Sequence, residues 1–182
     1  MLQGNSVKYS TPQTPRARLP RMNVATWLVP ALIVADQAIK LAVLAAVGPR
    51  ALEPEVGAVF LTHLFWVVDA TFIKNTGAAF GLFQGGARVL VWVSLLVGFG
   101  LLLYLSLQRR ANLLGQVALS LVAAGALGNA IDRLGRGWVV DYIDINRTGL
   151  AFLDNFPIWN LADACVVVGV ALLLLPQRKR RY

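Results

Sequence analysis

Residues 87–107 read ARVLVWVSLLVGFGLLLYLSL, and the stretch has no charged side chain after Arg88. A helix needs about 20 mostly apolar residues to cross the hydrocarbon core of a bilayer, so this stretch predicts a transmembrane helix. Three further apolar runs of comparable length lie at 24–47, 113–131 and 158–176. The sequence therefore predicts an α-helical integral membrane protein with four transmembrane helices.

The composition of the chain agrees with a membrane protein. Of its 182 residues, 57% are apolar and only 14% are charged, whereas soluble domains usually have about 25% charged residues. The formal net charge of +8 would also suit a nucleic-acid-binding protein. The basic residues, however, flank the apolar runs in short clusters and do not form a basic surface with interleaved aromatic residues. Binding to nucleic acid is therefore not expected.

The clusters of basic residues predict the orientation in the membrane. They precede the first run, separate the second from the third and follow the fourth, whereas all nine acidic residues lie between Asp36 and Asp163. Because cytoplasmic segments carry the excess of Lys and Arg, both termini are expected in the cytoplasm and the polar loops outside. The first run resembles a secretory signal peptide in position, but its length and its internal Asp36 and Lys40 favour a retained helix.

The expected domain organisation follows from these spans. Residues 1–22 predict a disordered basic cytoplasmic tail, 23–176 a single membrane domain, and 177–182 a second basic tail. Between the first two spans, 48–86 predicts a small extracytoplasmic subdomain, and 132–157 a second outer loop. Short strands are expected at Val59–Thr62 and Ala70–Lys74, and they suggest a small sheet at the membrane surface.

Ionisable residues inside a transmembrane helix are costly, so each one marks a polar site. Asp36 and Lys40 share a helical face at i, i+4 spacing and can form an ion pair. This pair is either structural or takes part directly in chemistry. At the outer end of the third run, Asn129, Asp132 and Arg133 are expected to project towards one region. Since Arg can hold a carboxylate bidentately, Asp132 is interpreted as a supporting residue.

Two further carboxylates are candidates for chemistry. Asp163 enters the membrane from outside and shares a face with Asn160, although it can also be simply a first-turn residue whose negative charge is favoured by the helix dipole. Asp141 lies in an apolar stretch suited to the membrane interface. If the loop brings Asp141 beside Asp163, the pair would share one proton and could act as general acid and base, as in aspartic proteases.

Other kinds of site have little support. Cys165 is the only cysteine and His63 the only histidine, so a thiol nucleophile, a Ser/His triad and a metal site are not expected. No cofactor is predicted. The tryptophans are interpreted as interface anchors or packing residues; they are Trp27, Trp66, Trp92, Trp138 and Trp159. Transport by a proton or ion relay through Asp36, Lys40 and Asp163 is the competing class. It is disfavoured because the inner halves of the third and fourth runs carry no charge.

The chain carries five motifs in a fixed order: DQAIK at 36–40, NTGAAF at 75–80, GALGNAIDR at 125–133, VVDY at 139–142 and NLAD at 160–163. In these motifs it resembles the bacterial lipoprotein signal peptidases (signal peptidase II), over residues 24–176. Trp159 stands where that family usually has Phe. The long N-terminal tail has no counterpart in the motif set.

The resemblance implies a four-helix membrane bundle with an extracytoplasmic β-cradle at about 48–86. It implies an intramembrane aspartic endopeptidase of the inner membrane, which removes signal peptides from diacylglyceryl-modified prolipoproteins just before the lipidated cysteine and is inhibited by globomycin. The implied catalytic residues are Asp141 and Asp163. The implied substrate-binding or supporting residues are Asp36, Lys40, Asn75, Gly77, Asn129, Asp132, Arg133 and Asn160, and no metal is implied. Asn75 and Arg133 are candidates to position substrate or loop by hydrogen bonds.

Overall fold

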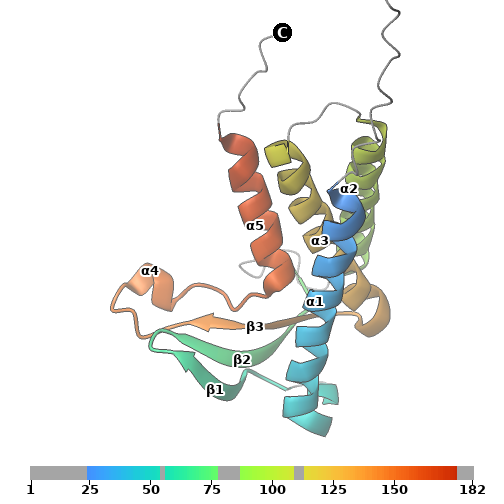
Figure 1. The fold of residues 1–182 in the computed structure, drawn as a ribbon. Helices are drawn as coiled ribbons and strands as arrows, with labels where there is room; N and C mark the ends of the chain where they lie inside the picture. Colours follow the sequence, from blue (N-terminus) through green and yellow to red (C-terminus); the bar gives the residue numbers. More distant parts are fainter. Residues whose placement is uncertain (1–23, 54–55, 78–86, 109–112, 176–182) are drawn as a thin grey trace, which may run out of the picture.

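A computed structural model of the chain describes residues 24–53, 56–77, 87–108 and 113–175 (Figure 1). The expected tails at 1–22 and 177–182, and the part of the NTGAAF motif after Gly77, lie outside the described residues. Three helices are long and apolar enough to cross a membrane. They are α1 (Ala25–Val47), α2 (Ala87–Leu107) and α3 (Leu113–Arg136). A further apolar helix, α5 (Leu161–Leu174), has 14 residues.

The sides of the long helices expose large apolar side chains, as lipid-facing helices do. On α2, Trp92 and Leu96 are 73% and 76% exposed, and on α1 Val34 is 67% exposed. Contiguous apolar surface of this kind is uncommon on soluble monomers. The membrane character predicted from the apolar runs is therefore confirmed.

Helix α3 forms the centre of the bundle and packs against α1, α2 and α5. Glycines allow the close approach of α3 and α5. A Cβ on Gly125 would overlap the carbonyl oxygen of Ala162, and a Cβ on Gly169 would lie 2.7 Å from the carbonyl oxygen of Ala118. Small residues at such crossings let the backbones approach, which is how helices associate in membranes.

An antiparallel sheet in the order β1-β2-β3 lies across one end of the bundle (Figure 1). Strands β1 (Val59–Phe65) and β2 (Val68–Asn75) form a hairpin and include the two strands expected from the sequence. The third strand, β3 (Val139–Ile145), comes from the stretch interpreted only as an interface segment. Its run of Val, Tyr and Ile favours a strand once β2 supplies a pairing edge.

The C-terminal end of α1 packs against this sheet. Val43 and Val47 of α1 join Phe72, Val140 and Tyr142 in a buried apolar cluster. This contact fixes β3 relative to the bundle. Two short helices complete the fold, the 3-10 helix η1 (Gly48–Leu52) after α1 and α4 (Ala151–Asp154) after β3.

Two helix boundaries differ from the ends of the apolar runs. Helix α3 continues to Arg136, beyond the end of the apolar run at 131, and includes Asp132 and Arg133 near its end, as expected. Helix α5 begins at Leu161 rather than at 158, because Asn160 caps it in an extended conformation. Asn is a favoured N-cap residue, and this explains the later start.

Candidate active site

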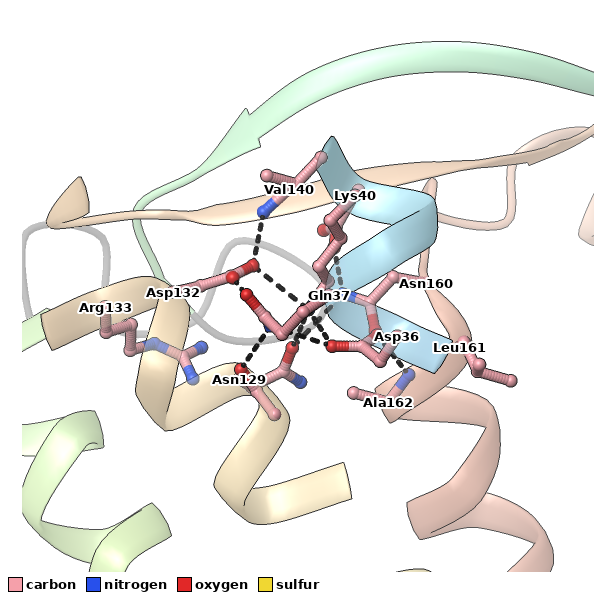
Figure 2. Close-up of polar contacts among 12 residues, drawn as sticks. Asp36, Gln37, Lys40, Asn129, Asp132, Arg133, Val140, Asn160, Leu161 and Ala162 are labelled. Atoms are coloured by element: carbon pink, nitrogen blue, oxygen red, sulfur yellow. Dashed lines mark hydrogen bonds and ion pairs between the residues drawn. The ribbon is translucent and has the colours of Figure 1, made fainter. Parts of the chain in front are cut away.

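Lys40 is the centre of a buried polar cluster that joins α1 to α3. Its Nζ lies 2.9 Å from Asp36 Oδ2 and 3.0 Å from Asp132 Oδ2, and it donates to Asn129 Oδ1 at 3.0 Å. Figure 2 shows these side chains converging between the two helices. Lys40 is 0% exposed. The ion pair expected between Asp36 and Lys40 is thus present, and a second carboxylate shares the ammonium.

Asp132 does not pair with Arg133, the residue next to it in the sequence. Its Oδ1 accepts from Arg136 Nη1 at 2.6 Å, and its Oδ2 accepts from the backbone N–H of Val140 at 3.1 Å. Residues one apart on a helix point in different directions, whereas residues four apart share a face. The i, i+4 spacing of Asp132 and Arg136 was the signal in the sequence, and it was missed.

Gln37 is a second residue that the sequence analysis did not single out. Its Nε2 lies 3.1 Å from Asp36 Oδ2, 3.1 Å from Asp132 Oδ1 and 3.2 Å from the carbonyl oxygen of Gly128. A polar residue within an apolar run was the available signal. Gln37 carries no charge, and it stabilises the two carboxylates by donating hydrogen bonds to both.

The start of α5 is held by side chains of this region. The backbone N–H of Ala162 donates to Asp36 Oδ1 at 3.1 Å, and that of Leu161 donates to the hydroxyl of Tyr142 at 3.3 Å. The first N–H groups of a helix have no partner within it, so such acceptors are needed when the helix end is buried. Asp36 therefore has a structural role in positioning α5.

Asp163 lies in the first turn of α5. Its Oδ2 accepts from the backbone N–H of Asn160 at 3.3 Å, and its own N–H donates to Asn160 Oδ1 at 2.9 Å, which makes a capping box. Its Oδ1 accepts from Asn129 Nδ2 at 2.7 Å. Asp163 is thus a first-turn residue and at the same time lines a cavity, so the two interpretations of this residue are compatible.

Asp141 lies on β3 and is 1% exposed. Its Oδ1 accepts from Asn160 Nδ2 at 2.6 Å, and its Oδ2 accepts from Asn75 Nδ2 at 2.8 Å. Burial and the charge of Asp163 together raise the pKa of Asp141 to about 7, against the lowering effect of the two amide hydrogen bonds. The neutral carboxyl is therefore well populated near pH 7.

Asn160 connects the two carboxylates. Its side-chain amide nitrogen donates to Asp141 Oδ1, its backbone N–H donates to Asp163 Oδ2, and the residue is fully buried. Arg133 and Asn75 hold the turn after β2: Arg133 Nη2 donates to the carbonyl oxygen of Gly77 at 2.9 Å, and the N–H of Gly77 donates to Asn75 Oδ1 at 3.0 Å. Every site residue expected from the sequence therefore belongs to one connected region.

A cavity of about 850 Å³ opens beside the two carboxylates. Asp141, Asp163, Asn129 and Arg133 line its polar part, and the remaining wall is apolar, with Phe156, Trp159, Val166 and Val167 among its residues. Ligand sites combine a mostly apolar wall with a few polar groups in this way. Two carboxylates in so buried a place can share one proton and exchange it with a bound water or peptide.

No chemistry was expected of His63 or of Cys165. His63, on β1, pairs with Asp69 at 2.7 Å, and neither residue is among those that line the cavity. Cys165 is buried in α5 and packs as a small apolar residue.

Comparison with known proteins points to one family. The family model described as "Signal peptidase (SPase) II" matches residues 28–177. The chain is 40% identical over 144 residues to a lipoprotein signal peptidase of Synechocystis, covering 78% of this chain and 80% of the relative. It is 43% identical over 109 residues to that of Microcystis aeruginosa, covering 60% and 66%, and 44% identical over 128 residues to that of Deinococcus radiodurans, covering 63% of each. The matched segment thus spans just under two thirds of the length of some of these relatives.

A solved structure described as a bacterial membrane enzyme is similar over the whole fold. The TM-score is 0.69 at 29% sequence identity, with 85% of this chain and 87% of the other covered. A second structure with the same description gives a TM-score of 0.66 at 28% identity, with 85% and 92% covered.

Proposed function

Because the chain belongs to the signal peptidase II family, we propose that it is a membrane protease that cleaves signal peptides from bacterial prolipoproteins, with Asp141 and Asp163 as its catalytic pair. The observation that carries the proposal is the joint position of these carboxylates. They come from β3 and α5, line the same cavity and both accept hydrogen bonds from Asn160, Asp141 from its side-chain amide and Asp163 from its backbone N–H.

The proposed mechanism needs one proton on the pair. We assign this proton to Asp141, since its pKa is raised to about 7, and assign to Asp163 the role of the base. Asp163 takes a proton from a water molecule, and the resulting hydroxide attacks the scissile carbonyl carbon while Asp141 donates a hydrogen bond to the carbonyl oxygen. The tetrahedral intermediate then collapses, the C–N bond breaks, and the proton taken from water passes to the leaving nitrogen.

The apolar wall of the cavity is proposed to hold the lipid part of the substrate. Val166 and Val167 of α5, together with Phe156, offer a surface for acyl chains next to the carboxylates. A diacylglyceryl-modified cysteine placed there would present the peptide bond before it to Asp141 and Asp163. Globomycin is proposed to compete for the same cavity.

The proposed arrangement in the membrane has four crossings, with α5 as the fourth. Its 14 residues are about 21 Å long at 1.5 Å per residue, less than the roughly 30 Å of a hydrocarbon core. The start of α5 and the site therefore lie below the outer surface of the bilayer, where a lipid anchor is found. We place the sheet outside the inner membrane, and both ends of the chain in the cytoplasm.

The test is cleavage of a prolipoprotein by the purified protein in lipid. Asp141→Asn and Asp163→Asn keep the shape of each side chain but remove its acid–base chemistry, so each should lower kcat by at least about 100-fold. Asp144→Asn is the matched control, because Asp144 is on the same strand and does not line the cavity. Substrate without the diacylglyceryl group should be cleaved far more slowly.

Two results would contradict the proposal. One is near-full turnover by either variant at the catalytic pair. The other is intact lipidated substrate with the unmodified protein, under conditions in which a known signal peptidase II cleaves it. In the second case proton flux across proteoliposomes would be measured next, since a relay through Asp36, Lys40 and Asp163 predicts flux and a peptidase does not.

A further inference from the structure

The turn between β1 and β2 presents large apolar side chains to the surroundings. Phe65 pairs with Val68, so Trp66 and Val67 form a two-residue turn, and Phe65 and Trp66 are 75% and 94% exposed. Two-residue hairpin turns usually contain Asn, Asp or Gly. Together with Leu64, which is 49% exposed, these residues form an apolar tip at Leu64–Val67 that would be unfavourable in water.

The apolar tip is fixed in place by the end of β3. The backbone N–H of Asn146 donates to the carbonyl oxygen of Val67 at 3.0 Å, and Arg147 Nε donates to that of Trp66 at 3.3 Å. Arg147 also binds both oxygens of Asp69 on β2, at 2.6 and 2.9 Å, and it holds the pKa of Asp69 well below its usual range. The aromatic side chains are therefore presented on a rigid support.

The position of the sheet relative to the helices places this tip near lipid. In the proposed arrangement α5 is about 9 Å shorter than a hydrocarbon core of roughly 30 Å, so its start lies below the outer surface of the bilayer. The sheet lies at that end of the bundle, which brings it to the outer boundary of the bilayer. Figure 1 shows that the hairpin end of the sheet projects sideways beyond α5, with α4 on the side from which the helices rise. On this neighbouring segment Phe152 is also largely exposed.

We propose that the apolar tip at Leu64–Val67 is embedded in the headgroup region of the outer leaflet and acts as a lipid anchor for the sheet. Trp and other aromatic residues are favoured at this depth, because their rings are apolar and the indole N–H can still bond to headgroups or water. The tip is at one end of the sheet, and α1 and α5 hold the other end. The sheet is thereby supported at two points, which sets the depth of Asp141. The proposal rests on the membrane arrangement given above, in which α5 is the fourth crossing.

The experiment measures depth and does not need activity. In a Cys165→Ala background, a nitroxide label is attached at Val67→Cys, and the full chain is placed in nanodiscs of palmitoyl-oleoyl phosphatidylcholine. Leu52→Cys in η1 is the matched control, because Leu52 is 82% exposed, and Val93→Cys on α2 marks lipid. Collisions of the label with oxygen and with a water-soluble nickel chelate are then compared.

The label at Val67 should collide with the nickel chelate much less often than the label at Leu52, and with oxygen nearly as often as the label at Val93. Replacing Trp66 with Glu in the Val67→Cys protein should raise its nickel collisions. Equal nickel accessibility at Val67 and Leu52 would overturn the proposal. Because the discs contain only lipid and this chain, a substrate or partner protein cannot be what shields the label at Val67 from the nickel chelate.

A second measurement links the tip to cleavage. Phe65→Glu with Trp66→Glu should raise KM for a lipidated substrate in nanodiscs and leave KM in detergent micelles unchanged, whereas Leu52→Glu should change neither. An equal rise in both media would indicate that the tip binds substrate instead of lipid and would overturn the proposal. If the unmodified protein cleaves nothing, the proposed function fails, and the depth measurement still decides the anchor.

Discussion

Asp141 accepts hydrogen bonds from two amide side chains, which lower its pKa, but burial raises this pKa by more. Its pKa, raised to about 7, determines the sign of the pH dependence. Below this pKa the carboxyl is neutral and can donate to the scissile carbonyl, and above it both members of the pair are charged. We therefore expect kcat/KM to fall as the pH rises through about 7, measured from pH 5 to 9 with lipidated substrate.

The amide of Asn75 supplies the control for this pH dependence. Asn75 Nδ2 donates to Asp141 Oδ2 and stabilises the charged form. Asn75→Leu should therefore move the alkaline limb to a higher pH, in addition to any loss of rate. A limb at an unchanged pH in this variant would assign the titration to a group other than Asp141.

Lys40 neutralises two carboxylates that no solvent reaches. Lys40→Met would leave Asp36 and Asp132 buried without their shared cation, and breaking a buried ion pair in this way costs about 3–5 kcal/mol. Thermal unfolding of the purified protein in lipid should show a large loss of stability. Lys74→Met on the partly exposed β2 should cause little loss of stability. Adding Asp36→Asn to Lys40→Met should restore part of the stability that Lys40→Met loses. Wild-type stability in Lys40→Met would contradict this account of the cluster.

At the scale of elements, the crossing of α3 and α5 determines the geometry of the site. Asn129, which lies on α3 four residues after Gly125, donates to Asp163 on α5. Gly125→Ala would push the two helices apart, since the new Cβ would overlap Ala162. We expect a loss of about 1–3 kcal/mol of stability and a fall in kcat.

Gly100→Ala on α2 is the matched control for this crossing, because a Cβ there meets no atom within 4 Å. Both variants would be compared by thermal unfolding and by cleavage. If Gly125→Ala behaved like Gly100→Ala, the close approach of α3 and α5 would not be what positions Asp163.

The helices could be predicted from the sequence because the membrane imposes a length and a composition on them. The spans starting at 24 and 87 agree with α1 and α2 within a residue. The strand β3 could not be predicted, since its hydrogen-bond partners lie on β2, more than 60 positions earlier. The start of α5 also depends on tertiary contacts, because Asp36 and Tyr142 accept its first N–H groups.

The residues of the candidate site could be predicted from the sequence better than the contacts between them. Polar residues in apolar runs, and the resemblance in the five motifs, identified Asp36, Lys40, Asp141 and Asp163. The partner of Asp132 and the role of Gln37 were missed, because side-chain direction within a helix turn decides them. That Asn160 joins the two carboxylates required the path of the loop after β3, which no local pattern specifies.

At the scale of the whole molecule, the first residue of α1 and the last residue of α5 lie at the same end of the bundle, and the sheet lies at the other (Figure 1). The positive-inside rule predicts that the sheet lies outside the cytoplasmic membrane. In a Cys165→Ala background, Thr62→Cys on β1 should react with a membrane-impermeant maleimide added to intact spheroplasts. Gln108→Cys, at the end of α2, should react only after the membrane is opened. The reverse pattern would invert the topology.

The capping of α5 by site residues has a consequence for biosynthesis. Among the described helices, α5 leaves the ribosome last, and Asp36, which accepts a hydrogen bond from its first turn, is made long before it. Until that helix is inserted, Asp141 has neither Asn160 to bind nor Asp163 beside it. A nascent chain that still lacks α5 therefore cannot assemble the carboxylate pair, so the proposed activity begins only after this helix has been made and inserted.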